Sequence, residues 1–177
     1  MKKESAVYAE HLLDLFTEIA HRVVTEQPLR EIEAEITPSL AQGLQFLFQH
    51  ECCSVRNVAE GLSMSFSAAS QLVERLVKRG MVTRCEKAED RRLSEIRVTE
   101  KGRDLVMQLR ERRVAGMSRI LDRMEDADRS ALVANLEKFI TAAIGDEKSA
   151  LETCSHCGRE HLSECVINAA YLGKAKY

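Results

Sequence analysis

Apolar residues spaced three or four positions apart predict that the chain is built mostly from helices. In residues 5–25, Leu12, Phe16, Ile19 and Val23 follow this spacing, and Pro28 is expected to break the helix. The spacing returns in later segments, whose predicted helical ranges are 38–49, 54–61, 65–79, 100–124 and 127–144. A polar linker is expected over residues 146–153, and a separate tail over 154–177.

Small polar residues and glycines mark several predicted helix ends. Ser54, Thr99 and Asp126 stand where an N-cap side chain can accept a hydrogen bond from the first turn of a helix. Gly61 is placed to end its helix in the left-handed conformation, which glycine adopts without steric cost, and Gly80 is expected to stop the next helix. The helices 54–61 and 65–79 should therefore be short and separated by a three-residue turn.

Residues 81–85 and 93–98 alternate in polarity and flank a charged run, which predicts a β-hairpin with a charged tip. The two short helices before the hairpin form a helix-turn-helix, whose second helix normally enters the major groove of DNA. The predicted fold class is therefore mainly α with a small β-hairpin wing, a winged helix-turn-helix.

The charge of the chain supports this interpretation only when it is divided by segment. The 177 residues carry 26 Lys and Arg against 28 Asp and Glu, a net charge of -2, which excludes a wholly cationic binder of polyanions. Residues 65–103 contain ten basic and six acidic residues, so this segment is +4 and the remainder is −6. A cationic third within an acidic chain fits a protein that binds phosphates and then reads a sequence.

The predicted second helix of the helix-turn-helix offers side chains suited to DNA. Glutamine can pair with adenine through two hydrogen bonds, serine can serve several bases, and cations one or two turns later can meet phosphates. The alternative is that these are ordinary solvated positions of a surface helix. The candidate DNA-binding residues of this helix are Ser65, Ser67, Ala68, Ser70, Gln71, Arg75 and Lys78.

Two motifs resemble the MarR family of winged-helix regulators. One is Asp90-Arg91-Arg92 followed after five residues by the stretch 98–103, and the other is the helix ending 71–82. The order of elements agrees over residues 5–145. The resemblance implies a DNA-binding lobe at about 38–99 and a homodimer formed by helices 5–25, 100–124 and 127–144. It also implies that Asp90 braces the wing while Arg91 or Arg92 reaches the minor groove.

The same resemblance implies what the protein does. Members of this family repress or activate genes at palindromic operators in double-stranded DNA, and they often bind small-molecule effectors. A repressor is the expectation here, with an activator as the alternative. No Ser/His/Asp set, phosphate loop or pair of catalytic carboxylates is evident in the sequence, so we do not expect an enzyme. No targeting segment or membrane span is recognisable, which favours a cytoplasmic protein with reduced thiols.

The tail carries a spacing that the family pattern does not include. Cys154, Cys157, His161 and Cys165 are separated by three, four and four positions, and Gly158 follows the Cys-x-x-Cys pair. Three thiolates and one imidazole make the closed tetrahedral set that is typical of structural zinc.

Other interpretations of the tail stay open: an iron–sulfur cluster, a redox dithiol, no metal, or a sensing switch that controls DNA binding through metal or redox state. His156 could replace His161 as a ligand, although it sits inside the knuckle. The remaining cysteines, Cys52, Cys53 and Cys85, are expected to be small buried apolar residues. The alternative is that Cys52 or Cys53 is a peroxide-sensing thiolate near Arg56.

Overall fold

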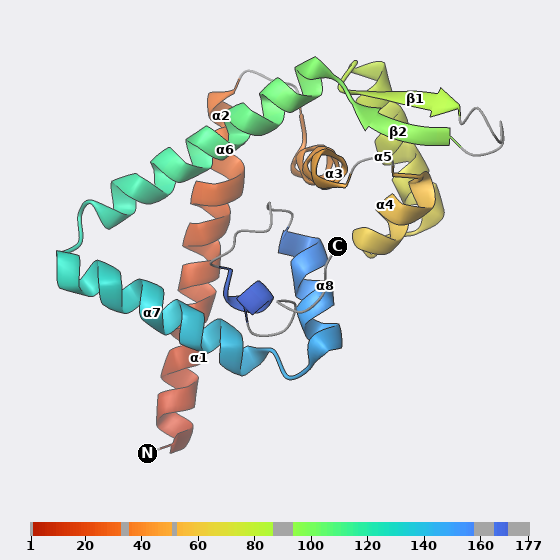
Figure 1. Ribbon diagram of the computed structural model, residues 1–177. Helices are drawn as coiled ribbons and strands as arrows, with labels where there is room; N and C mark the ends of the chain where they lie inside the picture. Colours follow the sequence, from red (N-terminus) through yellow and green to blue (C-terminus); the bar gives the residue numbers. More distant parts are fainter. Residues whose placement is uncertain (1, 33–35, 51–52, 87–93, 158–164, 170–177) are drawn as a thin grey trace. The chain divides into compact units, whose positions relative to one another are not determined.

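The structure is a computed structural model that describes residues 2–32, 36–50, 53–86, 94–157 and 165–169 (Figure 1). The chain divides into two compact units. The first unit combines Met1–Pro38 with Met107–Arg123, and the second combines Ser39–Val106 with Met124–Tyr177.

The first unit begins with one nearly continuous helical run. Helix α1 (Lys2–His21) passes into a π-helical turn, η1 (Arg22–Glu26), and then into α2 (Gln27–Glu31). The expected break at Pro28 is wrong, because the helical run continues through this buried proline, which lies in the first turn of α2 directly after the π-helical turn.

The second half of helix α6 (Glu100–Leu121) completes the first unit. Arg113 donates from Nε to the carbonyl oxygen of Val24 in the π-helical turn, at 2.8 Å. Arg112 and Arg119 both pair with Glu31, at 3.5 and 3.7 Å. These contacts attach α6 to the η1 and α2 segment. The helix ends three residues before the expected position 124.

The second unit contains the predicted winged helix-turn-helix, which confirms the fold class. Its elements are α3 (Pro38–Gln49), α4 (Val55–Gly61), α5 (Phe66–Lys78), β1 (Val82–Glu86), β2 (Ser94–Val98), the start of α6, α7 (Asp126–Ala143) and α8 (Glu147–Cys157). Its main core gathers apolar side chains from α3, α4, α5, both strands and α6. The most deeply buried of them are Leu44, Val58, Ala69, Val73, Leu76, Val82 and Ile96.

The hairpin strands are antiparallel and pair Val82 with Val98 and Arg84 with Ile96 (Figure 1). Ile96 also donates its backbone N–H to the carbonyl oxygen of Cys53, at 2.8 Å, so β2 is held on its other side by the segment before α4. The base of the wing is thereby joined to the helix-turn-helix.

Two glycines at helix ends have different functions. Gly80 follows the end of α5, where the sequence predicted a stop, and it has φ +69. The expectation for Gly61 is wrong: it is the last residue of α4, and the left-handed residue of the turn is Ser63, with φ 51. Gly61 is needed for space, because a Cβ there would overlap the ring of Phe46.

The segment after α7 differs most from expectation. Residues predicted as a polar linker lie largely in α8, whose start is capped by Asp146, since its carboxylate accepts from the N–H of Ser149 at 2.7 Å. A small apolar cluster formed by Ile144, Ala150 and Ile167 holds α8 to the short segment 165–169. The linker expectation is wrong, because Ala150 and Cys154, one turn apart, form a short apolar side of α8 that packs on this cluster.

Among the described residues, no helix combines the length and the apolar character that crossing a membrane requires.

Candidate nucleic-acid interface

Helix α4 is fixed at its start by a capping box. The hydroxyl of Ser54 accepts from the backbone N–H of Asn57 at 3.2 Å, and the side chain of Asn57 accepts from the N–H of Ser54 at 2.9 Å. Two otherwise unpaired N–H groups are satisfied in this way. The turn Leu62-Ser63-Met64 then leads directly to α5, as the sequence predicted.

Helix α5 is strongly amphipathic. Its inner stripe, Ala69, Leu72, Val73 and Leu76, is buried as predicted. Gly43 lets α3 approach this stripe closely, because a Cβ at that position would lie 2.5 Å from a methyl group of Leu72. The buried stripe therefore fixes the rotation of α5 and determines which side chains it presents outward.

The predicted DNA-facing residues of α5 lie together on its outer surface. Ser65 is the N-cap and accepts from the N–H of Ala68 at 3.2 Å, so its hydroxyl already has a structural function. Ser70 is half-buried. The exposed members of the set are Ser65, Ser67, Ala68, Gln71, Arg75 and Lys78. Arg75 and Lys78 also stand in the last turn of α5, where cations stabilise the negative end of the helix dipole.

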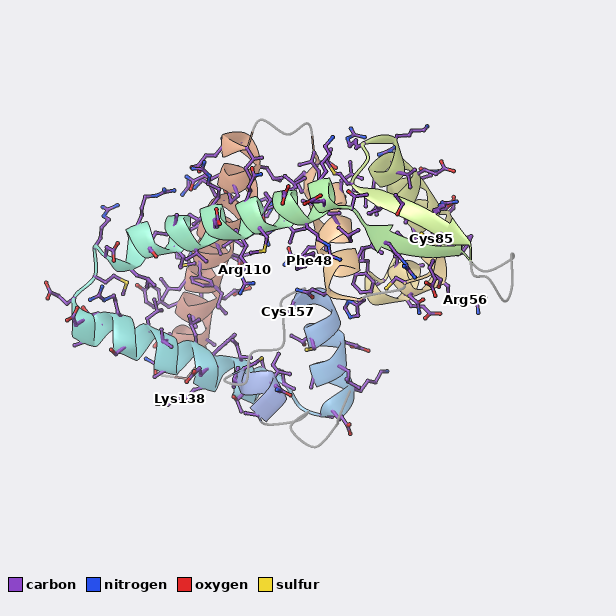
Figure 2. All side chains as sticks on the ribbon, turned by 45° about the horizontal axis from the view of Figure 1, so that its top comes forward. Phe48, Arg56, Cys85, Arg110, Lys138 and Cys157 are labelled. Carbon is purple, nitrogen blue, oxygen red and sulfur yellow. The ribbon has the colours of Figure 1, made fainter. Side chains whose placement is uncertain are left out.

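Two exposed residues of the helix-turn-helix were not among the sequence candidates. Phe66, the first residue of α5, is 63% exposed although it is large and apolar. Aromatic side chains can contact the methyl group of thymine in the major groove. Arg56 lies exposed on the first turn of α4 (Figure 2). An aromatic residue directly after an N-cap, outside the apolar stripe, is the signal that could have identified Phe66.

Several cations counted in the +4 segment make contacts within the protein. Lys101 donates from Nζ to the carbonyl oxygen of Arg79, at 2.9 Å, at the end of α5. The guanidinium of Arg103 lies 5.9 Å from the ring centre of Phe48, and Arg97 pairs with Glu95 at 3.3 Å. The local positive charge is therefore partly structural, whereas Arg75 and Lys78 project outward.

Thr99 joins the end of α5, the wing and α6. Its hydroxyl lies 2.7 Å from the carbonyl oxygen of Gly80, to which it donates, and it accepts from the N–H of Gly102 at 3.1 Å. The predicted N-cap is thus also a tie between consecutive elements. The wing-tip residues Asp90, Arg91 and Arg92 lie outside the described residues.

The cysteines fall into two environments. Cys53 is buried beneath the wing, with its thiol 3.0 Å from the carbonyl oxygen of His50, as expected for a small core residue. Cys85 is half-buried on β1, and Cys52 lies outside the described residues. In the tail, Cys154 and Cys165 both pack against the cluster of Ile144, Ala150 and Ile167.

The surroundings of Cys154 disfavour its charged form. Burial, and then the negative charges of Cys157 and Cys165, raise the pKa of Cys154. In the described part of the chain, no group of three or more His, Cys, Asp or Glu residues is already arranged to hold a metal ion. His161, the predicted fourth ligand, lies outside that part.

Comparisons with known proteins agree with this geometry. The model of the MarR family matches residues 36–94, which span the helix-turn-helix and most of the wing. A search of curated proteins finds no match.

Solved structures share the fold over most of the chain. Rv1404 from Mycobacterium tuberculosis is 28% identical, with a TM-score of 0.69, covering 77% of this chain and 92% of that one. A MarR family protein from Bacillus stearothermophilus is 22% identical, with a TM-score of 0.68 and coverage of 81% and 98%. MepR from Staphylococcus aureus, a regulator of a multidrug efflux pump, is 17% identical, with a TM-score of 0.67 and coverage of 76% and 98%. Residues 36–94 therefore match the MarR family model, and the chain has the winged helix-turn-helix fold seen in the solved MarR-type structures.

Proposed function

We propose that this protein is a sequence-specific DNA-binding transcription regulator that acts as a homodimeric repressor at palindromic operators. The observation that carries the proposal is the outer surface of α5, where Ser67, Gln71, Arg75 and Lys78 are exposed while the opposite stripe is buried. The family match supports it, because MarR proteins are transcription regulators and not enzymes. A variant of MepR was solved bound to an oligodeoxyribonucleotide.

The start of α5 would read bases, and its end would position the helix. Gln71 can pair with adenine, Ser67 can accept or donate to several bases, and Phe66 can pack on a thymine methyl. Arg75 and Lys78, one and two turns after Gln71, suit phosphates and carry no sequence information by themselves. By family resemblance, Arg91 or Arg92 of the wing would enter a narrow minor groove, which attracts arginine.

An exposed apolar stripe on α1 supports the homodimer. Tyr8, Leu12, Leu15, Phe16 and Ile19 follow helical spacing and are between 43% and 64% exposed in the single chain. A stripe this long on a soluble protein would be costly unless another surface covered it. A second copy is the proposed cover, since a twofold axis would also match the two halves of a palindrome.

Helix α7 carries a second surface of this kind. None of its residues is buried in the single chain, and Val133 and Phe139 are 51% and 53% exposed. The proposal assigns α7 to the same dimer interface. A cytoplasmic location and a small-molecule effector complete the proposed function as predictions from the sequence.

The central experiment measures binding to an operator selected from random double-stranded DNA, as a function of salt. Each phosphate contact contributes about 0.9 to the slope of log affinity against log salt. Replacing Arg75 and Lys78 together by alanine removes four contacts per dimer, so the slope should fall by about 3.6. Arg123→Ala, an exposed cation in the turn after α6, is the matched control. Equal slopes for all three proteins would refute the placement of α5 on phosphates.

The wing is tested in the same way. Arg91→Ala combined with Arg92→Ala should weaken binding at moderate salt, and an unchanged affinity would show that the wing assignment is wrong.

A separate experiment tests base reading by Phe66. Replacing each operator thymine in turn by uracil removes only the methyl group. At one position the exchange should lower the affinity for DNA by about five- to tenfold, which corresponds to the loss of a methyl contact of roughly 1 kcal/mol. In Phe66→Ser that position should become insensitive to the exchange. Persistent sensitivity in the variant would assign the methyl contact to another side chain.

The dimer is tested by sedimentation. Phe16→Glu places a charge in the α1 stripe and should shift the protein toward monomer, whereas Glu10→Gln, on the opposite side of α1, should leave it dimeric. A dimer of unchanged stability in Phe16→Glu would exclude this stripe from the interface.

A further inference from the structure

Arg56 is an exposed cation of the helix-turn-helix that the fold itself does not use. It lies in the first turn of α4, and no hydrogen bond or ion pair joins it to another of the described residues. Glu60 stands four positions later on the same helix, at a spacing that allows an ion pair, yet the two exposed side chains do not pair. The guanidinium therefore remains open to a partner outside the protein.

The position of Arg56 does not favour the helix that carries it. The positive end of the helix dipole lies at the start of α4, where acidic side chains are favourable and cations are not. The capping box of Ser54 and Asn57 completes this helix start without Arg56. A cation in this place is thus better explained by an external anion than by the stability of the fold.

The start of α4 is joined to the base of the wing. Ile96 of β2 donates to the carbonyl oxygen of Cys53, at 2.8 Å, three residues before Arg56. Figure 2 shows Arg56 projecting outward from the end of the second unit where the hairpin lies. In a helix-turn-helix the second helix lies in the major groove while the first helix crosses the sugar–phosphate backbone. The anion nearest to Arg56 would then be a phosphate at the edge of the groove that α5 occupies.

We propose that Arg56 contacts a DNA phosphate and so fixes the position at which α5 enters the major groove. This inference rests on the proposed function, and it adds a contact from α4 to those of α5 and the wing. The MarR-like motifs of the sequence lie in α5 and the wing, so they place no residue of α4 on DNA. Arg56 is a positioning residue, because phosphates are alike at every base pair and carry no sequence information.

The first test measures the affinity of the full-length protein for its selected operator between about 50 and 200 mM salt. Arg56→Ala removes one phosphate contact per chain, so the slope of log affinity against log salt should fall by about 1.8 for the dimer. Over this range the wild type should lose about twelvefold more affinity than the variant. Arg56→Lys keeps a cation and should keep most of the slope. Arg123→Ala changes the net charge equally, outside the second unit, and should keep all of it.

The second test identifies the phosphate. Neutral methylphosphonates replace the operator phosphates one at a time. In each half-site one replacement should weaken binding of the wild type and of Arg56→Lys but leave Arg56→Ala unaffected. This position should differ from those that become insensitive in Arg75→Ala and Lys78→Ala. Urea denaturation should show Arg56→Ala to be at least as stable as the wild type, because a cation has been removed from the positive end of the helix dipole.

The outcomes separate this inference from the proposed function. If the wild type binds its operator but Arg56→Ala keeps the same salt slope and the same methylphosphonate pattern, the contact of Arg56 is refuted and the regulator is not. A lower slope together with a clear loss of stability would assign Arg56 to the fold and would also overturn the contact. A wild type that selects no DNA would overturn both.

Discussion

Replacing Gly61 by alanine tests why a glycine ends the first helix of the helix-turn-helix. The new Cβ would overlap the ring of Phe46, which is 5% exposed. The ring cannot easily move away, because His50 stacks on it with ring centres 4.3 Å apart. Overpacking a core costs about 1–3 kcal/mol, and alanine in place of glycine in a helix gains up to about 1 kcal/mol. We expect a net loss of about 1–2 kcal/mol in the free energy of unfolding.

Urea denaturation followed by circular dichroism measures this loss. Gly145→Ala is the control, because a Cβ at Gly145 meets no described atom within 4 Å, and its effect should stay within about 0.5 kcal/mol. Combining Gly61→Ala with Phe46→Leu should reveal a coupling of at least about 1 kcal/mol, since the smaller side chain leaves room for the methyl group. If Gly61→Ala raised stability by the ordinary helix preference, the steric argument would be refuted.

Three further changes test single contacts. Thr99→Val should lower the free energy of unfolding by about 1–2 kcal/mol, because it removes the hydroxyl that links α5 to α6. Thr99→Ser keeps the hydroxyl and should lower it less, so equal losses would show that the hydroxyl does not make this link. Arg113→Ala should cost about 1–3 kcal/mol in thermal unfolding, since it leaves the carbonyl of Val24 without its charged donor, and no loss would show that water replaces it. The N–H and hydroxyl of Ser149 lower the pKa of Asp146, so this cap stabilises α8 at neutral pH and is lost as pH falls through the lowered pKa. Ser149→Ala should move that pKa upward in an NMR titration, and an unmoved value would contradict the hydroxyl's part.

The sequence predicted those parts of the fold in which local signals and burial agree. The cap at Ser54, the buried stripe of α5 and the end of α5 just before Gly80 all appeared as expected, because each depends on a few neighbouring residues. Pro28 and Gly61 were misinterpreted because their structural context is not recognisable from the local sequence pattern. At Pro28 a helical run is already in progress, and at Gly61 the ring of Phe46 occupies the space that a side chain would need.

The candidate site was also predicted only in part. The outward-facing residues of α5 could be identified from the sequence, because their exposure follows from the position of the apolar stripe. Which cations were free could not be predicted: Lys101 and Arg103 have partners in α5 and α3 that only the folded chain brings near. Phe66 was not among the candidates, although it lies outside the apolar stripe and is exposed.

The hydrogen bond from Ile96 to Cys53 has a consequence for how DNA would be recognised. It ties the hairpin to the chain ahead of α4, and Thr99 ties its other end to the end of α5. Hydrogen bonds on both sides of the hairpin therefore join the reading helix to the wing base, and they would fix the distance between the two before DNA is bound. Any mismatch in groove spacing must then be absorbed by bending the DNA, whose cost varies with base sequence. Base pairs that the protein never touches would in this way contribute to the choice of operator.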